Sequence, residues 1–149
     1  MRKIAIALGV AAAAISTPAM ANEARVEARA GVISVFGEEE AIAGVAAGYD
    51  FDLGDTVFAG VEASADKVLI DGADVAWGFT GRLGTKLGAD TKLFAAAGYT
   101  VGEGEDVEHL GAGIQHNVSD NLYVKAEYRH FFGSFADGDS GVIGLGLRF

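Results

Sequence analysis

The chain has 149 residues, no cysteine, and 21 acidic residues against 11 basic ones, which gives a formal net charge of −10. Without cysteine, neither disulfides nor thiolate metal sites can hold the fold. The acidic balance argues against a nucleic-acid partner, because binding to phosphates depends on lysine and arginine.

The N-terminal segment is typical of an export signal. Two basic residues precede an apolar run over residues 4–15, and small residues follow at 19–21. A membrane-spanning helix needs about 20 apolar residues, so this run is too short for a membrane anchor. We therefore predict a signal peptide over residues 1–21, with cleavage between Ala21 and Asn22. Residues 22–149 are then of a length suited to one domain.

The remaining chain carries a repeat of short turn signals, 31 to 35 residues apart and flanked by about ten residues of alternating character. These signals are Leu53-Gly54-Asp55, Gly88-Ala89-Asp90 and Ser119-Asp120-Asn121. Each one predicts a tight hairpin. An initial strand over 25–36 and a final strand over 141–149 bring the total to eight. The sequence thus predicts an all-β fold, an eight-stranded antiparallel up-and-down transmembrane β-barrel.

Four segments between the hairpins are rich in acidic residues and are predicted to be loops at the opposite end of the barrel. They cover 37–40, 66–74, 102–106 and 133–140. Glu38 to Glu40 and Glu103 to Asp106 concentrate oxygen ligands, so one hypothesis is that they bind divalent cations bridged to lipopolysaccharide. The alternative is a solvated acidic crown, and neither segment has the spacing of a dedicated calcium loop.

Alternation assigns two different faces to the strands, because successive side chains point to opposite sides of a sheet. One register is apolar in every strand; it includes Val26, Val45, Val61, Phe79, Leu93, Ile114, Val124 and Leu145. The other register mixes glycine with charge. Glycine weakens a strand, but in a narrow lumen it leaves room for long charged side chains to cross. We therefore place charge inside the barrel and the apolar register outside.

Charged residues buried in a lumen need partners, because an unpaired buried charge is costly. We predict an ion-pair network in which three glutamates face six basic residues: Glu27, Glu62 and Glu127 with Arg29, Arg82, Lys86, Lys125, Arg129 and Arg148. Its predicted role is structural. The alternative role is a proton or ion pathway.

The last strand reads G-V-I-G-L-G-L-R-F and places Ile143, Leu145, Leu147 and Phe149 at every second position. In this strand, and in patterns such as Y-D-F-D-L-G and V-K-A-E-Y-R, the chain resembles the small outer-membrane barrels of the opacity-porin and OmpA-barrel type. The resemblance implies that the terminal phenylalanine is an assembly signal for the barrel-assembly machinery. The predicted loops are shorter than the variable loops of opacity-type adhesins, which disfavours a dedicated adhesive surface.

Some eight-stranded barrels modify lipid A, so the histidines are candidate catalytic groups. His130 is expected near the outer rim, with Ser134 and Asp137 in the following loop, and a histidine can activate a hydroxyl for acyl transfer. No H-x-S arrangement is present, and His109 and His116 have no nucleophile beside them in sequence. The sequence therefore favours a protein that is not an enzyme.

The leading hypothesis is a structural barrel of the Gram-negative outer membrane, with a role in envelope integrity or surface interactions and a lumen filled by side chains. Its expected partners are outer-membrane lipids, lipopolysaccharide, the barrel-assembly machinery and periplasmic chaperones in transit. We expect no cofactor and no metal. Two alternatives stay open: a lipid A-modifying enzyme, and a soluble periplasmic ligand-binding barrel with the two faces inverted.

Overall fold

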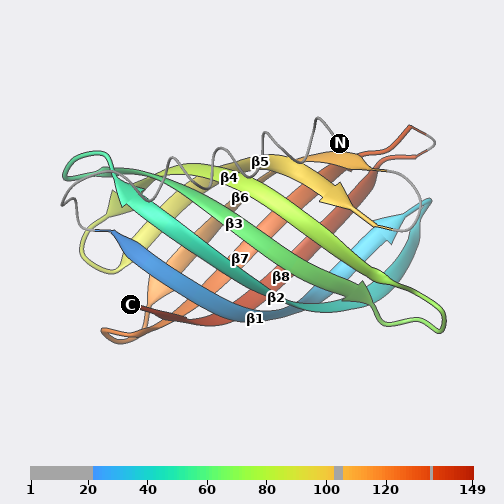
Figure 1. Ribbon diagram of the computed structural model, residues 1–149, viewed down its shortest axis with the longest axis horizontal. Coiled ribbons are helices and arrows are strands. Elements are labelled where there is room, and N and C mark those ends of the chain that lie inside the picture. The colour runs from blue at the N-terminus through green and yellow to red at the C-terminus, as the bar shows by residue number, and fades with distance from the viewer. Residues whose placement is uncertain (1–21, 103–105, 135) are drawn as a thin grey trace.

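The computed structural model describes residues 22–102, 106–134 and 136–149. These residues form a closed barrel of eight antiparallel strands in sequence order (Figure 1). The strands are β1 (Glu23–Val35), β2 (Glu38–Asp52), β3 (Val57–Val68), β4 (Val75–Leu87), β5 (Thr91–Val101), β6 (Val107–Asn117), β7 (Leu122–Phe132) and β8 (Gly138–Arg148). The predicted fold class is confirmed for these residues. The predicted signal segment, including Ala21, lies outside the described residues.

The barrel closes where the first strand meets the last. Val26 lies opposite Ala47 of β2 on one side and opposite Leu147 of β8 on the other. The backbone of Ala24 extends this seam to the last residue, since its amide donates to the Phe149 carbonyl at 3.2 Å and its carbonyl accepts from the Phe149 amide at 2.9 Å. Closure leaves no strand with an unpaired edge.

The two ends of the barrel differ in their connections. The described start of β1, the C-terminus and the three short turns gather at one end, on the left in Figure 1. We call this the turn end, and the opposite end the loop end. The three predicted tight turns are confirmed, and Gly54 and Gly88 adopt the positive φ values of 130° and 76° that such turns require.

The predicted loop over 37–40 is wrong. Phe36 and Gly37 alone connect β1 to β2, with φ values of 55° and 81°, and Glu38, Glu39 and Glu40 belong to β2. Positive φ at both central residues is the signature of a tight hairpin turn whose twist matches its strands. The three glutamates of the cation hypothesis, Glu38 to Glu40, are therefore strand residues and do not form a loop.

Strands also extend beyond other predicted boundaries. β3 continues to Val68, so Asp66 is a strand residue, and β8 begins at Gly138. As a result, charged residues do occur in the outward register near the loop end: Glu39, Lys67, Glu108 and Asp139. Their position at the strand ends keeps them away from the apolar middle of the wall. The predicted loop over 102–106 fits the gap between β5 and β6, although residues 103–105 lie outside the described part.

The assignment of the two faces is confirmed. Outward side chains are exposed and apolar, with Ile143 at 71% and Leu83 at 58% relative exposure, whereas inward Lys125 retains 1%. A soluble barrel with inverted faces is therefore excluded, because its charged register would have to point outward. The described residues include no helix that is long and apolar enough to cross a membrane.

Candidate functional site in the barrel lumen

Glycines stand opposite long charged residues in the lumen and leave room for those side chains to extend across it. Gly48 of β2 is paired with both Arg25 and Glu62, and Gly144 of β8 is paired with both Arg29 and Lys125. A methyl group added at Gly48 would stand 2.5 Å from the Arg25 guanidinium, and one added at Gly144 would stand 3.1 Å from the Glu27 carboxylate. The glycine register therefore provides space for the charged side chains.

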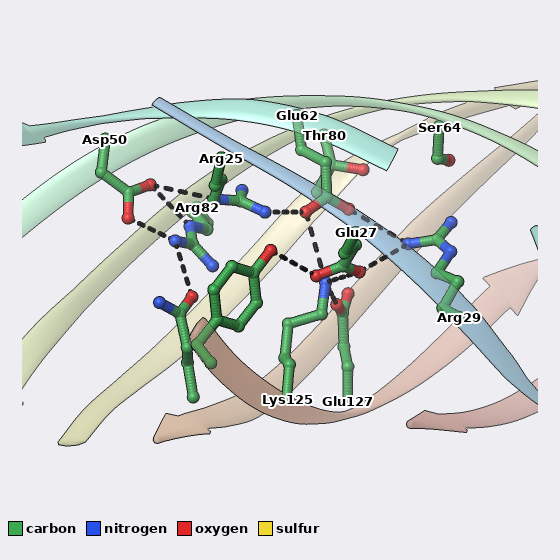
Figure 2. A network of polar contacts seen from close by, with 12 residues as sticks. Arg25, Glu27, Arg29, Asp50, Glu62, Ser64, Thr80, Arg82, Lys125 and Glu127 are labelled. Carbon is green, nitrogen blue, oxygen red and sulfur yellow. Dashed lines mark hydrogen bonds and ion pairs between the residues drawn. The ribbon is translucent and has the colours of Figure 1, made fainter. Parts of the chain in front are cut away.

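Glu62 and Lys125 stand at the centre of the lumen network (Figure 2). The carboxylate of Glu62 contacts four cations: Arg25 at 2.6 Å, Arg129 at 2.8 Å, Arg29 at 3.1 Å and Lys125 at 3.3 Å. The ammonium of Lys125 contacts Glu27 at 2.6 Å and Glu127 at 2.9 Å in addition to Glu62. Because each group has several partners of opposite charge, desolvation is offset at both.

The network continues from the centre toward the turn end through Asp50. Arg25 reaches the Asp50 carboxylate at 3.6 Å, and Arg82 binds the same carboxylate through both Nε and Nη2. Lys92 bridges Asp50 at 3.1 Å and Glu23 at 2.8 Å, and Glu23 accepts from Arg148 at 2.6 Å. A chain of ion pairs thus runs from the centre of the lumen to its rim.

Toward the loop end, the network finishes at Arg29 and Arg129. Arg29 binds the Asp66 carboxylate with two nitrogens, and Arg129 binds Glu127. Counted over these contacts, the connected network contains seven basic and six acidic side chains. Among the described residues, the lumen is therefore close to electrically neutral.

The nine predicted network residues differ in whether they reach the centre of the network. Six of them form the central cluster: Glu27, Arg29, Glu62, Lys125, Glu127 and Arg129. Arg82 and Arg148 join through Asp50 and Glu23 rather than through the predicted glutamates. Lys86 lies apart and pairs with Asp52 at 2.5 Å. The prediction that all six cations face the three glutamates is wrong for Arg82, Arg148 and Lys86.

Sequence reasoning missed five network residues: Glu23, Arg25, Asp50, Asp66 and Lys92. Arg25, Asp50 and Lys92 lie in the inward register, so the two-residue period of β1, β2 and β5 carried the signal that could have found them. Asp66 was assigned to a loop, which concealed its inward position.

Aromatic side chains close the lumen near the turn end, a feature that the sequence analysis did not identify. Phe58 and Tyr123 are 0% exposed, and Phe94 is also buried. The Arg82 guanidinium lies 4.9 Å from the Phe94 ring centre and 5.3 Å from that of Phe58, which are cation–π distances. The Tyr123 hydroxyl donates to Glu27 at 2.8 Å. We call Phe58, Phe94 and Tyr123 the aromatic floor.

A cavity opens above the network at the loop end. It has a volume of about 340 Å³, and charged residues line it only near the network and the β3–β4 loop. Its inward walls are apolar and include Ile33, Ile42, Val68, Val107, Phe131 and Val142. We call this cavity the outer cup.

The three histidines occupy different places. His109 is buried in the lumen between the hydroxyls of Thr80 at 2.9 Å and Thr100 at 3.1 Å. His116 contacts the Thr91 hydroxyl at the barrel surface. His130 lies at the loop-end rim, where its Nδ1 is 2.8 Å from Asp139 and its Nε2 is 3.9 Å from Asp137.

The predicted metal ligands give no cluster in the described residues. Nowhere among residues 22–102, 106–134 and 136–149 do three or more histidine or acidic side chains meet in a geometry suited to a metal ion. The acidic segment from Glu103 to Asp106 is the second segment of the cation hypothesis. Glu103 and Glu105 lie outside the described residues, so that hypothesis is not tested there.

The C-terminal strand presents its predicted signal to the outside. Ile143, Leu145, Leu147 and Phe149 all point outward and are exposed by 46–71%. The intervening inward residues of β8 include Gly144 and Gly146, which pack against Glu27 and Tyr123. One face of this strand is therefore apolar and uncovered by any other described residue, whereas the other contributes to the lumen.

The fold and the lumen define a class: a closed eight-stranded barrel that is apolar outside and self-paired inside. No family model matches the chain, and no curated protein matches it either. Solved structures do resemble it. The attachment invasion locus protein Ail of Yersinia pestis is 14% identical over 86% of this chain and 97% of that chain, with a TM-score of 0.64.

Two further solved barrels give similar values. The N-terminal β-barrel domain of OprF from Pseudomonas aeruginosa is 16% identical over 84% of this chain and 97% of that chain, with a TM-score of 0.60. Neisserial surface protein A is 14% identical over 85% of this chain and 95% of that chain, with a TM-score of 0.57. At these identities the likeness concerns the fold, and the chain spans almost the whole of each barrel.

Proposed function

We propose that this chain is a structural β-barrel of the bacterial outer membrane that contributes to envelope integrity or surface interactions. The observation that carries the proposal is the distribution of its side chains. The wall exposes a continuous apolar surface, while the ionic residues are buried and paired inside. A soluble protein of this size exposes apolar residues in small patches, so a barrel covered with them fits a hydrocarbon environment.

Strand length and aromatic residues support the same environment. The strands contain 11 to 15 residues, and about 9–11 tilted residues are enough to cross a bilayer. Exposed aromatic residues lie toward both ends of the wall: Phe149 at the turn end, and Trp77, Tyr99 and Tyr128 toward the loop end. Such rings favour the two membrane–water interfaces.

Export and assembly complete the proposal. Residues 1–21 act as a signal peptide that is removed before Asn22, and the exposed C-terminal strand ending at Phe149 is recognised by the barrel-assembly machinery after transit with periplasmic chaperones. Mass spectrometry of the mature protein tests the cleavage site. Deletion of Phe149 tests the assembly signal, with an expected loss of folded barrel at unchanged synthesis.

Outer-membrane lipids, including the acyl chains of lipopolysaccharide, are the proposed partners of the wall. Ail has been solved in a phospholipid bilayer nanodisc and in complex with the heparin analogue sucrose octasulfate. A lipid environment suits this chain as well. A polyanion does not, because the net charge is −10 and the loop end carries exposed acidic residues such as Asp71, Asp137 and Asp139.

The lumen network serves the stability of the barrel rather than conduction. Gln115 and Lys125 point into the interior and are 0% and 1% exposed, and the aromatic floor is buried as well. An eight-stranded barrel has an interior just wide enough for its own side chains. We therefore expect no open diffusion pore and no proton pathway, and planar-bilayer recordings should give no persistent conductance.

Catalysis at the rim is the second candidate, because Asp139 orients His130 as a carboxylate orients a catalytic histidine. The same carboxylate accepts a hydrogen bond from the Tyr128 hydroxyl. A structural contact at the membrane interface therefore also explains the pairing of His130 with Asp139. We propose that the chain is not an enzyme. His130→Ala and Ser134→Ala should leave the lipid A acyl pattern unchanged by mass spectrometry; a lost or gained acyl chain would contradict this.

The decisive test of the proposed function is fractionation followed by electrophoresis of boiled and unboiled protein. The chain should enter the outer-membrane fraction and migrate differently before heating, as a folded barrel does. Leu145→Arg should reduce the folded fraction, since a basic residue in the middle of a lipid-facing wall costs about 2–4 kcal/mol. Ser119→Arg, in a turn, is the matched control. Recovery in periplasmic extract without detergent would overturn the proposal.

A further inference from the structure

The outer cup is a concave apolar surface inside a barrel whose central lumen is ionic. Its volume of about 340 Å³ falls within the range of small-molecule sites. The walls come from strands around the barrel: Ile33 from β1, Ile42 from β2, Val107 from β6 and Val142 from β8. Covering these walls with an apolar molecule would remove apolar area from water, which is favourable.

The charged groups at the base of the cup are already neutralised by one another. Arg29 binds Asp66 and Glu62, and Arg129 binds Glu62 and Glu127. Figure 2 shows Arg29 at the end of the network, opposite Asp50 and Arg82. A charged ligand would have to displace one of these pairs or be buried without a partner, and both are costly. The electrostatics of the cup therefore favour an uncharged occupant.

The cup has no continuation toward the turn end within the described residues. Lys125 in the network, and Gln115 and Phe58 near the turn ends of their strands, are all 1% exposed or less. A molecule that enters from the loop end therefore meets a packed barrier. This geometry suits retention of a ligand rather than its passage through the barrel.

We propose that the outer cup is a binding site for one small uncharged apolar molecule held at the loop end of the barrel. The apolar walls supply the affinity. The self-paired base rejects charged analogues, and the packed lumen below keeps the ligand from crossing.

The test uses the mature chain in phospholipid nanodiscs, titrated with cyclohexane and with its charged relatives cyclohexanecarboxylate and cyclohexylammonium. Methyl NMR of Ile33 and Ile42 monitors the cup, and the outward methyl of Ile143 monitors partition of the probe into lipid. Cyclohexane should give saturable shifts at the cup methyls and only a linear response at Ile143. Each charged relative should bind at least about tenfold more weakly.

Two filling variants and one matched control separate the cup from the bilayer. Ala76→Trp and Val107→Phe enlarge inward side chains that line the cup, whereas Val75→Trp enlarges an outward neighbour on β4. Each variant is first checked for the heat-dependent mobility of a folded barrel, so that one filling variant suffices if the other does not fold. Binding should weaken at least about tenfold in a folded filling variant and be unchanged in Val75→Trp.

Three results would overturn the proposal: non-saturable cup shifts that parallel Ile143, saturable binding that survives cup filling, or charged relatives that bind as tightly as cyclohexane. Each is obtained with folded protein in a bilayer. Failure of the cup is therefore distinguishable from failure of the chain to form a membrane barrel.

Discussion

The two halves of the lumen are filled in different ways, although the same inward register lines both. Toward the turn end, Phe58 and Phe94 pack against the Arg82 guanidinium, Tyr123 binds Glu27, and almost no surface of the three rings is left exposed. Toward the loop end, aliphatic residues line an open cavity of about 340 Å³. The central ions around Glu62 separate the halves.

This difference shows how a narrow barrel combines stability with an accessible surface. Cation–π contacts and close packing at the turn end give that half the character of a protein core. The loop-end half leaves its apolar walls uncovered, so its residues contribute less to folding and remain available for binding. The comparison predicts that equivalent substitutions in the two halves have unequal consequences.

The largest expected effect is the loss of an aromatic ring from the floor. Phe58→Ala should lower the free energy of unfolding by about 4 kcal/mol, because it leaves a cavity and removes the contact with Arg82. Phe131→Ala, whose ring borders the outer cup, should lower it by only about 1 kcal/mol, since the cavity already exists. Denaturant unfolding from lipid vesicles measures both values. Equal losses would remove the distinction between the halves.

The second-largest loss of stability is expected from a substitution in the central network. Glu62→Gln keeps the shape of the side chain but removes the negative charge that faces Arg25, Arg29, Lys125 and Arg129. The expected loss is about 3 kcal/mol, because buried cations are left with too few partners.

Asp66→Asn is the matched substitution at the border of the cup. The Asp66 side chain is 23% exposed, and Arg29 retains Glu62, so a loss of about 1 kcal/mol is expected. Both variants are compared by the same vesicle unfolding measurement. A loss at Asp66 as large as that at Glu62 would show that the base of the cup is as dry as the centre.

The sequence predicted the fold because a two-residue period forces each strand to choose one environment for each face. Leu145 and Lys125 could be placed outside and inside on that ground alone. The hairpin turn at Phe36 and Gly37 could not be predicted, because three consecutive glutamates follow it and such a run is typical of a polar loop. In the structure they continue β2 at its exposed end, where solvation of their side chains does not compete with backbone pairing.

The identity of the ion pairs was harder to predict than the inward position of the charges. Pairs such as Arg29 with Asp66 join residues 37 positions apart, and the stagger between strands decides which side chains meet across a barrel. Strand stagger is not readable from alternation. Arg148 therefore meets Glu23 at the rim instead of a central glutamate.

The aromatic floor was missed for a different reason. Phe58 and Tyr123 occupy the register that otherwise holds glycine and charge. The apolar pattern that identifies the outer wall therefore does not include them. Their inward position follows only from counting two residues back from Gly60 and Lys125. Their role depends on the room that an opposing glycine leaves.

Glycine substitutions, with expected effects smaller than those of Phe58→Ala and Glu62→Gln, test that room directly. A methyl group at Gly146 would lie 2.5 Å from the Tyr123 hydroxyl, whereas one at Gly141, on the same strand but facing outward near the loop end, would meet no atom within 4 Å. Gly146→Ala should destabilise the barrel by about 2 kcal/mol through overpacking. Gly141→Ala should stabilise it by about 0.5 kcal/mol, because the unfolded chain loses freedom. If Gly146→Ala were neutral in the vesicle unfolding assay, Tyr123 would have room to shift, and the turn-end half of the lumen would not be the close-packed core inferred from its burial.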